Sequence, residues 1–322
     1  MAVSQSALER IQSLSKDPGL FLIDLENDLP EMWPAILRSR GYKQWAKLEA
    51  LGLKQEALAD SLQSLTFKSI VDYMDNLGPL SWQLPDKRKW QCSWVEDNDF
   101  KFDYYFTLVF SYLLSTNKRL PTEDEFWKMW LQLNGSAMQH NMSYMMDGST
   151  PTSCAAAMYV YSKKSNLGWD KAKIQEMILR GAEFRCKKAF AGLLREFYTI
   201  LALTVEIQPE NIRKPQSPCT TWWHPLLDCV AKCDAIVQPQ NSDQLPTFLA
   251  IYLNSRTSRG HIKDHKNNGM LSGKLLNAAV ESVLYKQVEN GIYLPEENLI
   301  FKLRMAINGN KEAIMQMQGY YT

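Results

Sequence analysis

One stretch of helical periodicity, Trp169–Val205, constrains the fold more than any other part of the 322-residue chain. This spacing predicts a long amphipathic helix, for which Asp170 is a candidate N-cap. The apolar residues that recur at three- and four-residue steps are Ile174, Met177, Ile178, Phe184, Leu193, Leu194, Phe197, Ile200 and Leu201. The polar side is rich in cations, namely Lys171, Lys173, Arg180, Arg185, Lys187, Lys188 and Arg195.

Two apolar segments rich in β-prone residues lie downstream of this helix. Asp228–Val237 is short and stops before Pro239, and Thr247–Leu253 starts after Pro246 and ends at Asn254. Their length and composition favour strands over helices, and the polar link between them has the composition of a turn. We therefore expect two consecutive strands here.

Weaker patterns complete the C-terminal half. They predict a strand at Thr204–Gln208, a proline-containing loop at 209–223, an amphipathic helix at Leu271–Val288, and short strands at Ile292–Leu294 and Leu299–Leu303. The resulting order is helix, strand, strand, strand, helix, strand.

The N-terminal half is predicted to be mostly helical. Thr122 and Glu125 have the spacing of a capping box, in which each side chain accepts a hydrogen bond from the other residue's backbone. Phe126, Trp127 and Trp130 follow at helical spacing and are expected in the core, with a base-stacking surface as the alternative.

Together these segments predict an α+β fold with two parts. Residues 1–165 form a mostly helical, Trp- and Met-rich region, and residues 166–322 form an α/β domain with a small mixed sheet. Hydrophobic residues make up 45% of the chain and charged residues 22%, which is typical of globular proteins. The net charge is only +1, so any affinity for nucleic acid must come from local patches.

Cysteine usage and the apolar runs bear on the compartment. The six cysteines form no CxxC pair, which favours reduced and buried thiols. No apolar core of the signal-peptide type is present near the N-terminus, and the run Tyr104–Leu114 is too short to span a bilayer. We expect a soluble, cytoplasmic protein with no membrane partner, and an origin in a phage or mobile element is equally compatible.

The most basic segment follows the second of the two consecutive strands. It contains seven basic residues against the single acid Asp264: Arg256, Arg259, His261, Lys263, His265, Lys266 and Lys274. Three glycines in the same segment predict a flexible loop. A cationic loop at the end of a strand can bind phosphate groups of a nucleic acid. The alternative is a solvated loop without a ligand.

The order of elements over Trp169–Leu303 resembles the core of the PD-(D/E)xK nuclease-like superfamily. That resemblance implies metal-dependent hydrolysis of phosphodiesters, with carboxylates that hold Mg²⁺ and a lysine that stabilises the transition state. Asp234, in the motif KCDAIV, matches the superfamily's aspartate, and Glu196 matches the extra acid on the preceding helix. These two residues are the candidate catalytic and metal-binding pair.

The resemblance is incomplete at the third strand. The superfamily has an acid-x-Lys motif there, whereas this chain has Tyr252-Leu253-Asn254 or, shifted, Asn254-Ser255-Arg256. Lys263 or Lys266 could replace the lysine, but no residue replaces the acid. Simpler roles also remain for the pair: Asp234 as a cap or turn acceptor at a strand end, and Glu196 as the partner of Arg195 in a surface ion pair.

The sequence therefore favours a DNA-binding protein with a nuclease-like core that has lost its catalytic acid. The expected phosphate-binding residues are Arg256, Arg259, His261, Lys263 and Lys266, extended by Lys187 and Lys188. One alternative is an active Mg²⁺-dependent nuclease that uses Asp234 and Glu196. The other is an interaction subunit of a larger assembly, which binds a protein partner through its aromatic-rich N-terminal region.

Overall fold

The computed structural model describes residues 3–14, 17–77, 105–206, 216–240, 243–253, 275–280, 282–284, 293–295 and 297–319. It confirms the α+β class, with a mostly helical N-terminal region and a small mixed sheet. Buried residues of both halves belong to one hydrophobic cluster. The division of the chain near residue 165 stays a prediction.

Five strands form the main sheet, in the order β1-β4-β5-β6-β7. Their bounds are β1 Gly19–Leu22, β4 Cys219–Trp223, β5 Ala235–Pro239, β6 Thr247–Leu253 and β7 Leu275–Val280. β5 is antiparallel to both of its neighbours, whereas β1 is parallel to β4 and β7 is parallel to β6. The N-terminal region therefore contributes one strand to this sheet. A separate hairpin pairs β8 (Ser282–Leu284) with β9 (Tyr293–Pro295).

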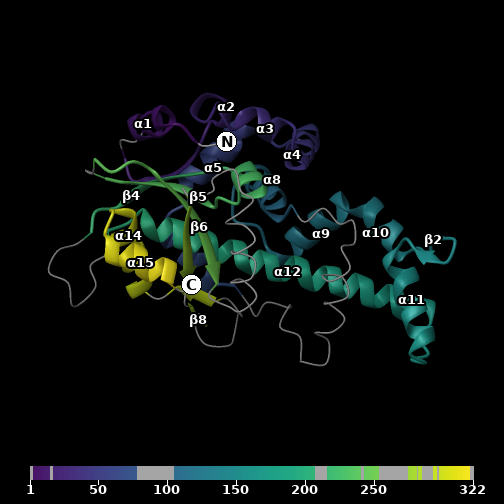
Figure 1. Cartoon of the computed structure of the whole chain (residues 1–322). Coiled ribbons are helices and arrows are strands. Elements are labelled where there is room, and N and C mark those ends of the chain that lie inside the picture. Colours follow the sequence, from purple (N-terminus) through teal and green to yellow (C-terminus); the bar gives the residue numbers. More distant parts are fainter. Residues whose placement is uncertain are drawn as a thin grey trace.

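Helices surround the sheet (Figure 1). In that view the first helices lie above the sheet and the two C-terminal helices lie below it. The N-terminal helices are α1 Gln5–Leu14, α2 Leu25–Asp28, α3 Trp33–Leu37, α4 Arg40–Ala50, α5 Gln55–Ser64 and α6 Phe67–Asp75. They are followed by α8 Phe106–Asn117, α9 Glu123–Leu133, α10 Gly135–Met142, α11 Cys154–Lys164 and α12 Lys171–Leu203, and then by α14 Glu297–Ile307 and α15 Lys311–Gly319.

The predicted long helix is α12, which has 33 residues and is about 50 Å long. Asp170 caps it as predicted, because its carboxylate accepts a hydrogen bond from the backbone N–H of Lys173 at 2.8 Å. Aromatic contacts join the C-terminal part of α12 to the rest of the core. Phe197 lies 4.9 Å from Phe110 of α8 and 5.0 Å from Trp223 of β4, measured between ring centroids. α12 is therefore the element that joins the sheet to the N-terminal helices.

The capping box before α9 is confirmed. Thr122 accepts a hydrogen bond from the Glu125 N–H at 3.2 Å, and Glu125 accepts one from the Thr122 N–H at 2.8 Å. Phe126 and Trp130 are fully buried, and Trp127 is half-buried against Trp130. In this part of the chain the helical aromatic residues are core, as expected.

Four predictions of secondary structure are wrong. Thr204 is the C-cap of α12, so no strand begins there, and the segment read as a loop contains the fully buried strand β4. The apolar residues of the helix expected at 271–288 belong instead to β7 and β8, because β7 pairs along its whole length with β6. The strand expected at Leu299–Leu303 is part of α14, whose buried Ile300, Leu303 and Ile307 recur at helical spacing.

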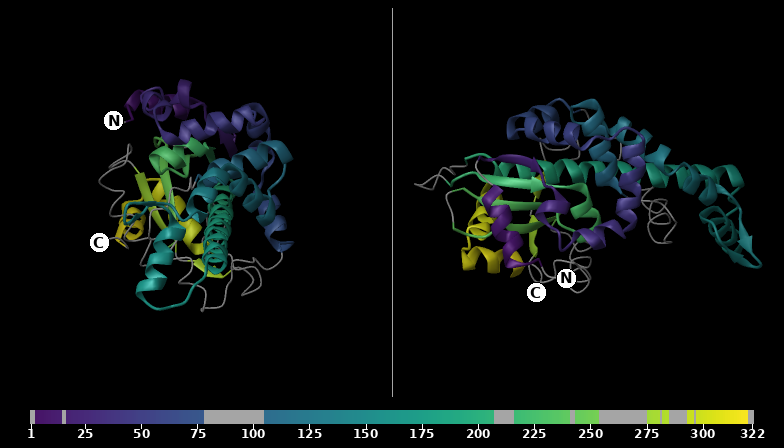
Figure 2. Two further views of the ribbon diagram at one scale, coloured as in Figure 1. Left: turned by 90° about the vertical axis from the view of Figure 1, so that its right-hand side faces the viewer. Right: turned by 90° about the horizontal axis from the view of Figure 1, so that it is seen from above.

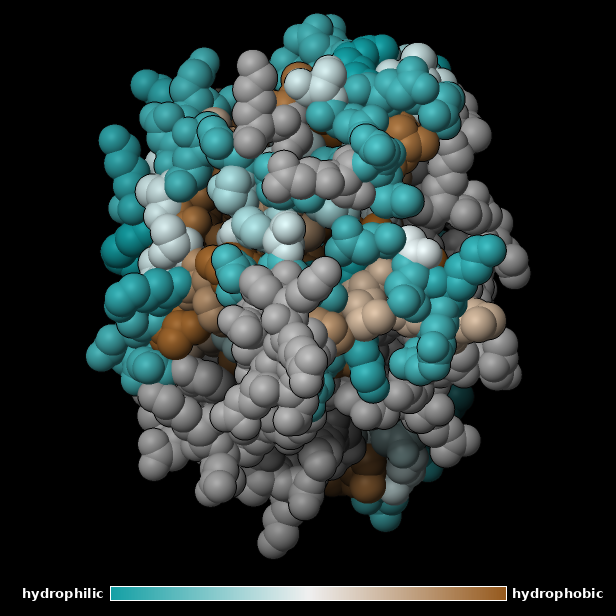
Figure 3. Space-filling model, turned by 90° about the vertical axis from the view of Figure 1, so that its left-hand side faces the viewer, coloured by the Kyte–Doolittle hydropathy of each residue, from teal (hydrophilic) through white to brown (hydrophobic). Residues whose placement is uncertain are grey.

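Large exposed apolar side chains are few in the described residues. Figure 3 shows hydrophilic residues over most of its coloured surface, with hydrophobic residues only in scattered patches. Five of the nine exposed large hydrophobic side chains lie on one projection of the molecule, the residues Met145, Met146, Tyr161, Leu167 and Leu179. We call this projection the arm. It consists of α10, the small hairpin of β2 (Met146–Asp147) and β3 (Thr150–Pro151), α11 and the first turns of α12, and it extends away from the sheet (Figure 2).

Candidate functional site

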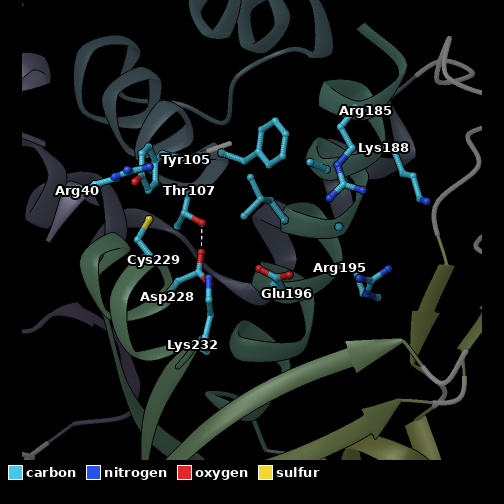
Figure 4. Close-up of a pocket in the computed structure, with 14 residues that line it drawn as sticks. Arg40, Tyr105, Thr107, Arg185, Lys188, Arg195, Glu196, Asp228, Cys229 and Lys232 are labelled. Atoms are coloured by element: carbon cyan, nitrogen blue, oxygen red, sulfur yellow. Dashed lines mark hydrogen bonds between the residues drawn. The ribbon is translucent and has the colours of Figure 1, made fainter. Parts of the chain in front are cut away.

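A pocket of about 530 Å³ lies where α12 passes the first residues of α4 and α8 (Figure 4). Its remaining wall is a five-residue π-helix, η2 (Leu227–Ala231), which stands between β4 and β5. π-Helical turns are rare and occur often at functional sites. The segment read as the start of a strand, Asp228–Val237, is therefore strand only from Ala235 onward.

The pocket concentrates positive charge. Among the 14 residues that line it, five are cationic and two are acidic. The cations are Arg40, Arg185, Lys188, Arg195 and Lys232. Arg195 is half-buried, and its Nε atom has no hydrogen-bond acceptor in the described part of the chain. A site of this composition attracts an anionic ligand, although the chain as a whole carries a net charge of only +1.

Three carboxyl groups from different elements lie next to these cations. Glu196 on α12 and Asp228 on η2 line the pocket, and Asp234 stands at the start of β5. Burial raises the pKa of Glu196 well above its ordinary value, and the charges of Asp234 and Asp228 raise it further. Burial and the Asp228 charge raise the pKa of Asp234 in the same way. The structure thus brings together the two acids that the sequence singled out, and it adds a third.

Asp234 also has a structural role. It is only 8% exposed, and its Oδ2 atom accepts a hydrogen bond from the backbone N–H of Ile251 at 2.5 Å. Its own N–H donates to the carbonyl of Leu249 at 2.8 Å, so Asp234 continues the pairing of β5 with β6. The strand-end acceptor role considered for Asp234 is therefore present.

The described residues do not fit a nuclease metal centre. The register Ala235↔Leu249 places Ala250 opposite Asp234, at the position where a second strand acid would face it. Ala250 has no oxygen ligand in its side chain, and Mg²⁺ requires oxygen ligands. Within the described ranges, no three histidine, cysteine or carboxylate side chains are arranged to hold a metal ion.

The close packing of α4 against η2 positions Arg40. Arg40 is the first residue of α4, and the next residue, Gly41, is buried against η2. A Cβ atom at Gly41 would lie 3.3 Å from the Cβ of Cys229 and 3.4 Å from a methyl group of Val230. Glycine therefore lets α4 pack closely against η2, and this packing places Arg40 at the pocket.

We expect Gly41→Val to lower the free energy of unfolding by about 1–3 kcal/mol, because the larger side chain overpacks this contact. Gly135→Val is the matched control, since a Cβ atom at Gly135 meets nothing within 4 Å. Urea denaturation measures both effects on stability. Equal stability of the two variants would contradict the proposed contact.

The raised pKa of Glu196 makes stability depend on pH. A carboxyl group that binds its proton more tightly in the folded chain than in the unfolded chain destabilises the fold as the pH rises above the ordinary value of 4.5. Glu196→Gln removes this titration and keeps the shape of the side chain. We expect its stability to change less than that of the wild type between about pH 5 and about pH 7.5, because the wild type loses stability over this range and the variant lacks the titrating group.

Urea denaturation at the two pH values measures this difference. Glu56→Gln, at an exposed position on α5, serves as the control and should follow the wild type. If Glu196→Gln keeps a constant stability difference from the wild type at both pH values, then Glu196 does not titrate as described.

Of the predicted phosphate-binding residues, the structure describes Lys187 and Lys188. Lys188 is exposed and lines the pocket. Lys187, its neighbour on α12, is only 6% exposed and forms ion pairs with Glu183 at 2.8 Å, Glu123 at 3.7 Å and Asp124 at 3.8 Å. Its charge is thus already matched by acids, and we keep only Lys188 of this pair as a candidate phosphate-binding residue. The loop residues Arg256, Arg259, His261, Lys263 and Lys266 lie outside the described residues.

Sequence reasoning missed several residues of the pocket. Arg40, Tyr105 and Thr107 come from the N-terminal half, and no pattern in the sequence links them to α12. The hydroxyl group of Thr107 donates a short hydrogen bond to Asp228 Oδ2, which connects α8 to η2. Lys232 directly follows η2 and has a positive φ of 57°. A lysine in this conformation is unusual, but only the structure reveals it.

Comparisons of the chain with protein-family models, curated proteins and solved structures find no match. In the described residues, no helix combines the length and the apolar character that crossing a bilayer requires. Function must therefore be inferred from the pocket and its surroundings.

Proposed function

We propose that this chain binds DNA through the cationic pocket between α4, α8, α12 and η2. One observation carries the proposal: five cationic side chains from three separate segments converge on a single pocket in a chain of almost neutral net charge. Phosphate groups are the most common large anionic ligand that such a cluster meets. The exposed Lys188 and Lys232 are suited to contact the DNA backbone, and the half-buried Arg195 offers an unsatisfied N–H donor.

Part of the order of elements supports a nuclease-like core. α12 is followed by three consecutive antiparallel strands, β4, β5 and β6. The helix expected at 271–288 is replaced by β7 and β8, and β7 lies parallel to β6. Glu196 on α12 and Asp234 directly before β5 are the candidate acids of such a core. Because Ala250 faces Asp234, we propose that the core binds DNA and has lost the second strand acid. The five free cysteines of the described residues fit a cytoplasmic protein, since thiols stay reduced there.

A titration of fluorescein-labelled 20-nucleotide DNA, single-stranded and duplex, tests this proposal by fluorescence anisotropy. We expect saturable binding whose affinity falls steeply as the salt concentration rises. No binding to either DNA at low salt, or an affinity independent of salt, would reject the proposal.

Cleavage needs a further oxygen ligand from outside the described residues. An active nuclease would cleave DNA in the presence of Mg²⁺ and would lose this activity in Asp234→Asn. The same titrations performed with Mg²⁺ and followed on denaturing gels distinguish binding from cleavage.

The arm favours a second candidate function, that of an interaction subunit. Met145 is 51% exposed, Met146 is 44% exposed and Tyr161 is 43% exposed, and all three lie on a projection away from the sheet (Figure 2). Grouped exposed apolar residues are typical of protein-binding surfaces. If the arm binds a protein, a pull-down from nuclease-treated extracts should recover a stoichiometric partner with the wild type but not with the double variant Met145→Ser, Met146→Ser. Recovery of the same proteins with both would reject this role for the arm.

A further inference from the structure

The pocket has two chemically different sides (Figure 4). Arg185 and Lys188 of α12 lie on one side, and Arg40 and Tyr105 lie on the other. Tyr105 is the residue before α8 and is half-buried. Asp228 and Glu196 lie between the two sides. The pocket therefore offers, in sequence, an end with two cations, a middle with carboxyl groups, and an end with one cation and an aromatic ring.

The carboxyl groups restrict what can occupy the middle. A phosphate placed there would meet the charge of Asp228, so phosphate belongs at the end where Arg185 and Lys188 supply two cations. The middle favours hydrogen-bond donors, because the carboxylate of Asp228 is an acceptor and the carboxyl group of Glu196 keeps an acceptor oxygen even when it is protonated. Asp228 already accepts the hydrogen bond from Thr107, and a carboxylate has room for further donors. The amino groups of nucleobases are donors of this kind, and aspartate and glutamate accept hydrogen bonds from cytosine N4.

The size of the pocket limits the occupant further. A volume of about 530 Å³ lies within the range of about 300–1,000 Å³ that is usual for small-molecule sites. A base can enter a pocket of this kind only when it is free of the stack, either in a single strand or after extrusion from a duplex. Aromatic rings then provide a stacking surface that tolerates any base.

We propose that the pocket binds one unpaired nucleotide of a single strand. The phosphate lies against Arg185 and Lys188, the amino edge of the base points toward Asp228 and Glu196, and the base contacts Tyr105. The inference rests on the proposed DNA binding and makes it specific, because it predicts a preference for single strands over duplexes.

Two variants test this inference in the full-length chain. Tyr105→Ala removes the stacking surface and should weaken binding of a cytosine- and adenine-containing 20-nucleotide single strand by about 5- to 100-fold. Gly192→Leu fills the pocket from its α12 wall. A Cβ atom at Gly192 meets only Arg195 Nη2, at 3.6 Å, and leucine is a better helix former than glycine, so this variant should fold normally. Tyr105→Trp is the rescue variant and should bind as the wild type does.

Anisotropy titrations with the single strand and with the corresponding duplex give the readout. We expect the wild type to prefer the single strand, and Tyr105→Ala and Gly192→Leu to lose this preference. The affinity of both variants for the duplex should change less than about threefold, since exposed cations outside the pocket interior still contact the backbone. Equal wild-type affinity for both DNAs, or an unchanged preference in Gly192→Leu, overturns the inference but leaves DNA binding intact. If the wild type binds neither DNA, both the inference and the proposed DNA binding are overturned.

A competition experiment distinguishes binding of a strand from binding of a free nucleotide. Cytidine monophosphate and adenosine monophosphate are added to the complex of the wild type with the single strand. We expect little displacement at concentrations at which an unlabelled single strand displaces fully, because neighbouring phosphates of the strand add contacts to Lys232 and Arg40. Displacement by the monophosphate at the same concentration as the strand would contradict a strand-binding site.

Discussion

Replacing Lys188 and Lys232 together with glutamine is expected to weaken DNA binding by about 60-fold at about 0.1 M salt. Both lysines are exposed and line the pocket, on α12 and directly after η2. For duplex DNA, each phosphate contact contributes about 0.9 to the slope of log affinity against log salt concentration, so the loss of two contacts changes this slope by about 1.8. Over the tenfold range from about 1 M to about 0.1 M salt, that change corresponds to about 1.8 log units of affinity. Single and double strands should both be affected, because the lost contacts are to the backbone.

The matched control is the double variant Lys173→Gln, Lys302→Gln. It makes the same change in net charge at two exposed positions, on α12 and α14, that do not line the pocket. It should bind DNA within about threefold of the wild type, since only general electrostatic attraction is reduced. If both double variants lose the same affinity, binding depends on overall charge and the pocket is not the site.

The largest effect on stability is expected for Arg304→Met. Arg304 of α14 is fully buried, and its guanidinium group donates to the carbonyls of Ala202, at 2.6 Å, and Gln216, at 3.2 Å, and by a shorter contact to that of Val205. The first and third of these carbonyls lie at the C-terminal end of α12. Methionine fills a similar volume but leaves three carbonyls without this donor, at about 1–3 kcal/mol for each buried unsatisfied group. We expect a loss of at least about 3 kcal/mol.

Urea denaturation provides the measurement. Arg304→Lys keeps the positive charge but donates from a single nitrogen, so its loss should be smaller than that of Arg304→Met. This ordering separates the hydrogen bonds from the charge. A loss below about 1 kcal/mol in Arg304→Met would show that Arg304 does not fasten α14 to the end of α12.

The parts of the fold that could be predicted were those set by local chemistry. The cap at Asp170, the capping box at Thr122 and the strand β6 depend on residues close in sequence, and each is confirmed. β7 could not be predicted, because Leu275–Val280 is a short apolar run that fits helix or strand equally well. Only its pairing with β6 decides between them.

The site was predictable to a smaller extent. A resemblance to nucleases singled out Asp234 and Glu196. In the structure the charge of Asp234 raises the pKa of Glu196, and the charge of Asp228 raises the pKa of both. The pocket beside them was not predictable, because Arg40 and Thr107 reach it only through tertiary packing. Burial also separates Lys187 from Lys188, although the two are adjacent in sequence.

The salt dependence of DNA binding tests the central claim most directly. The affinity of the wild type, of Lys188→Gln, Lys232→Gln and of Lys173→Gln, Lys302→Gln is measured for one duplex from about 0.05 to about 0.3 M KCl. If the pocket holds phosphates, the slope of log affinity against log salt becomes shallower by about 1.8 in the pocket variant and stays unchanged in the control. The same slope for the pocket variant and the wild type would contradict phosphate binding at this pocket.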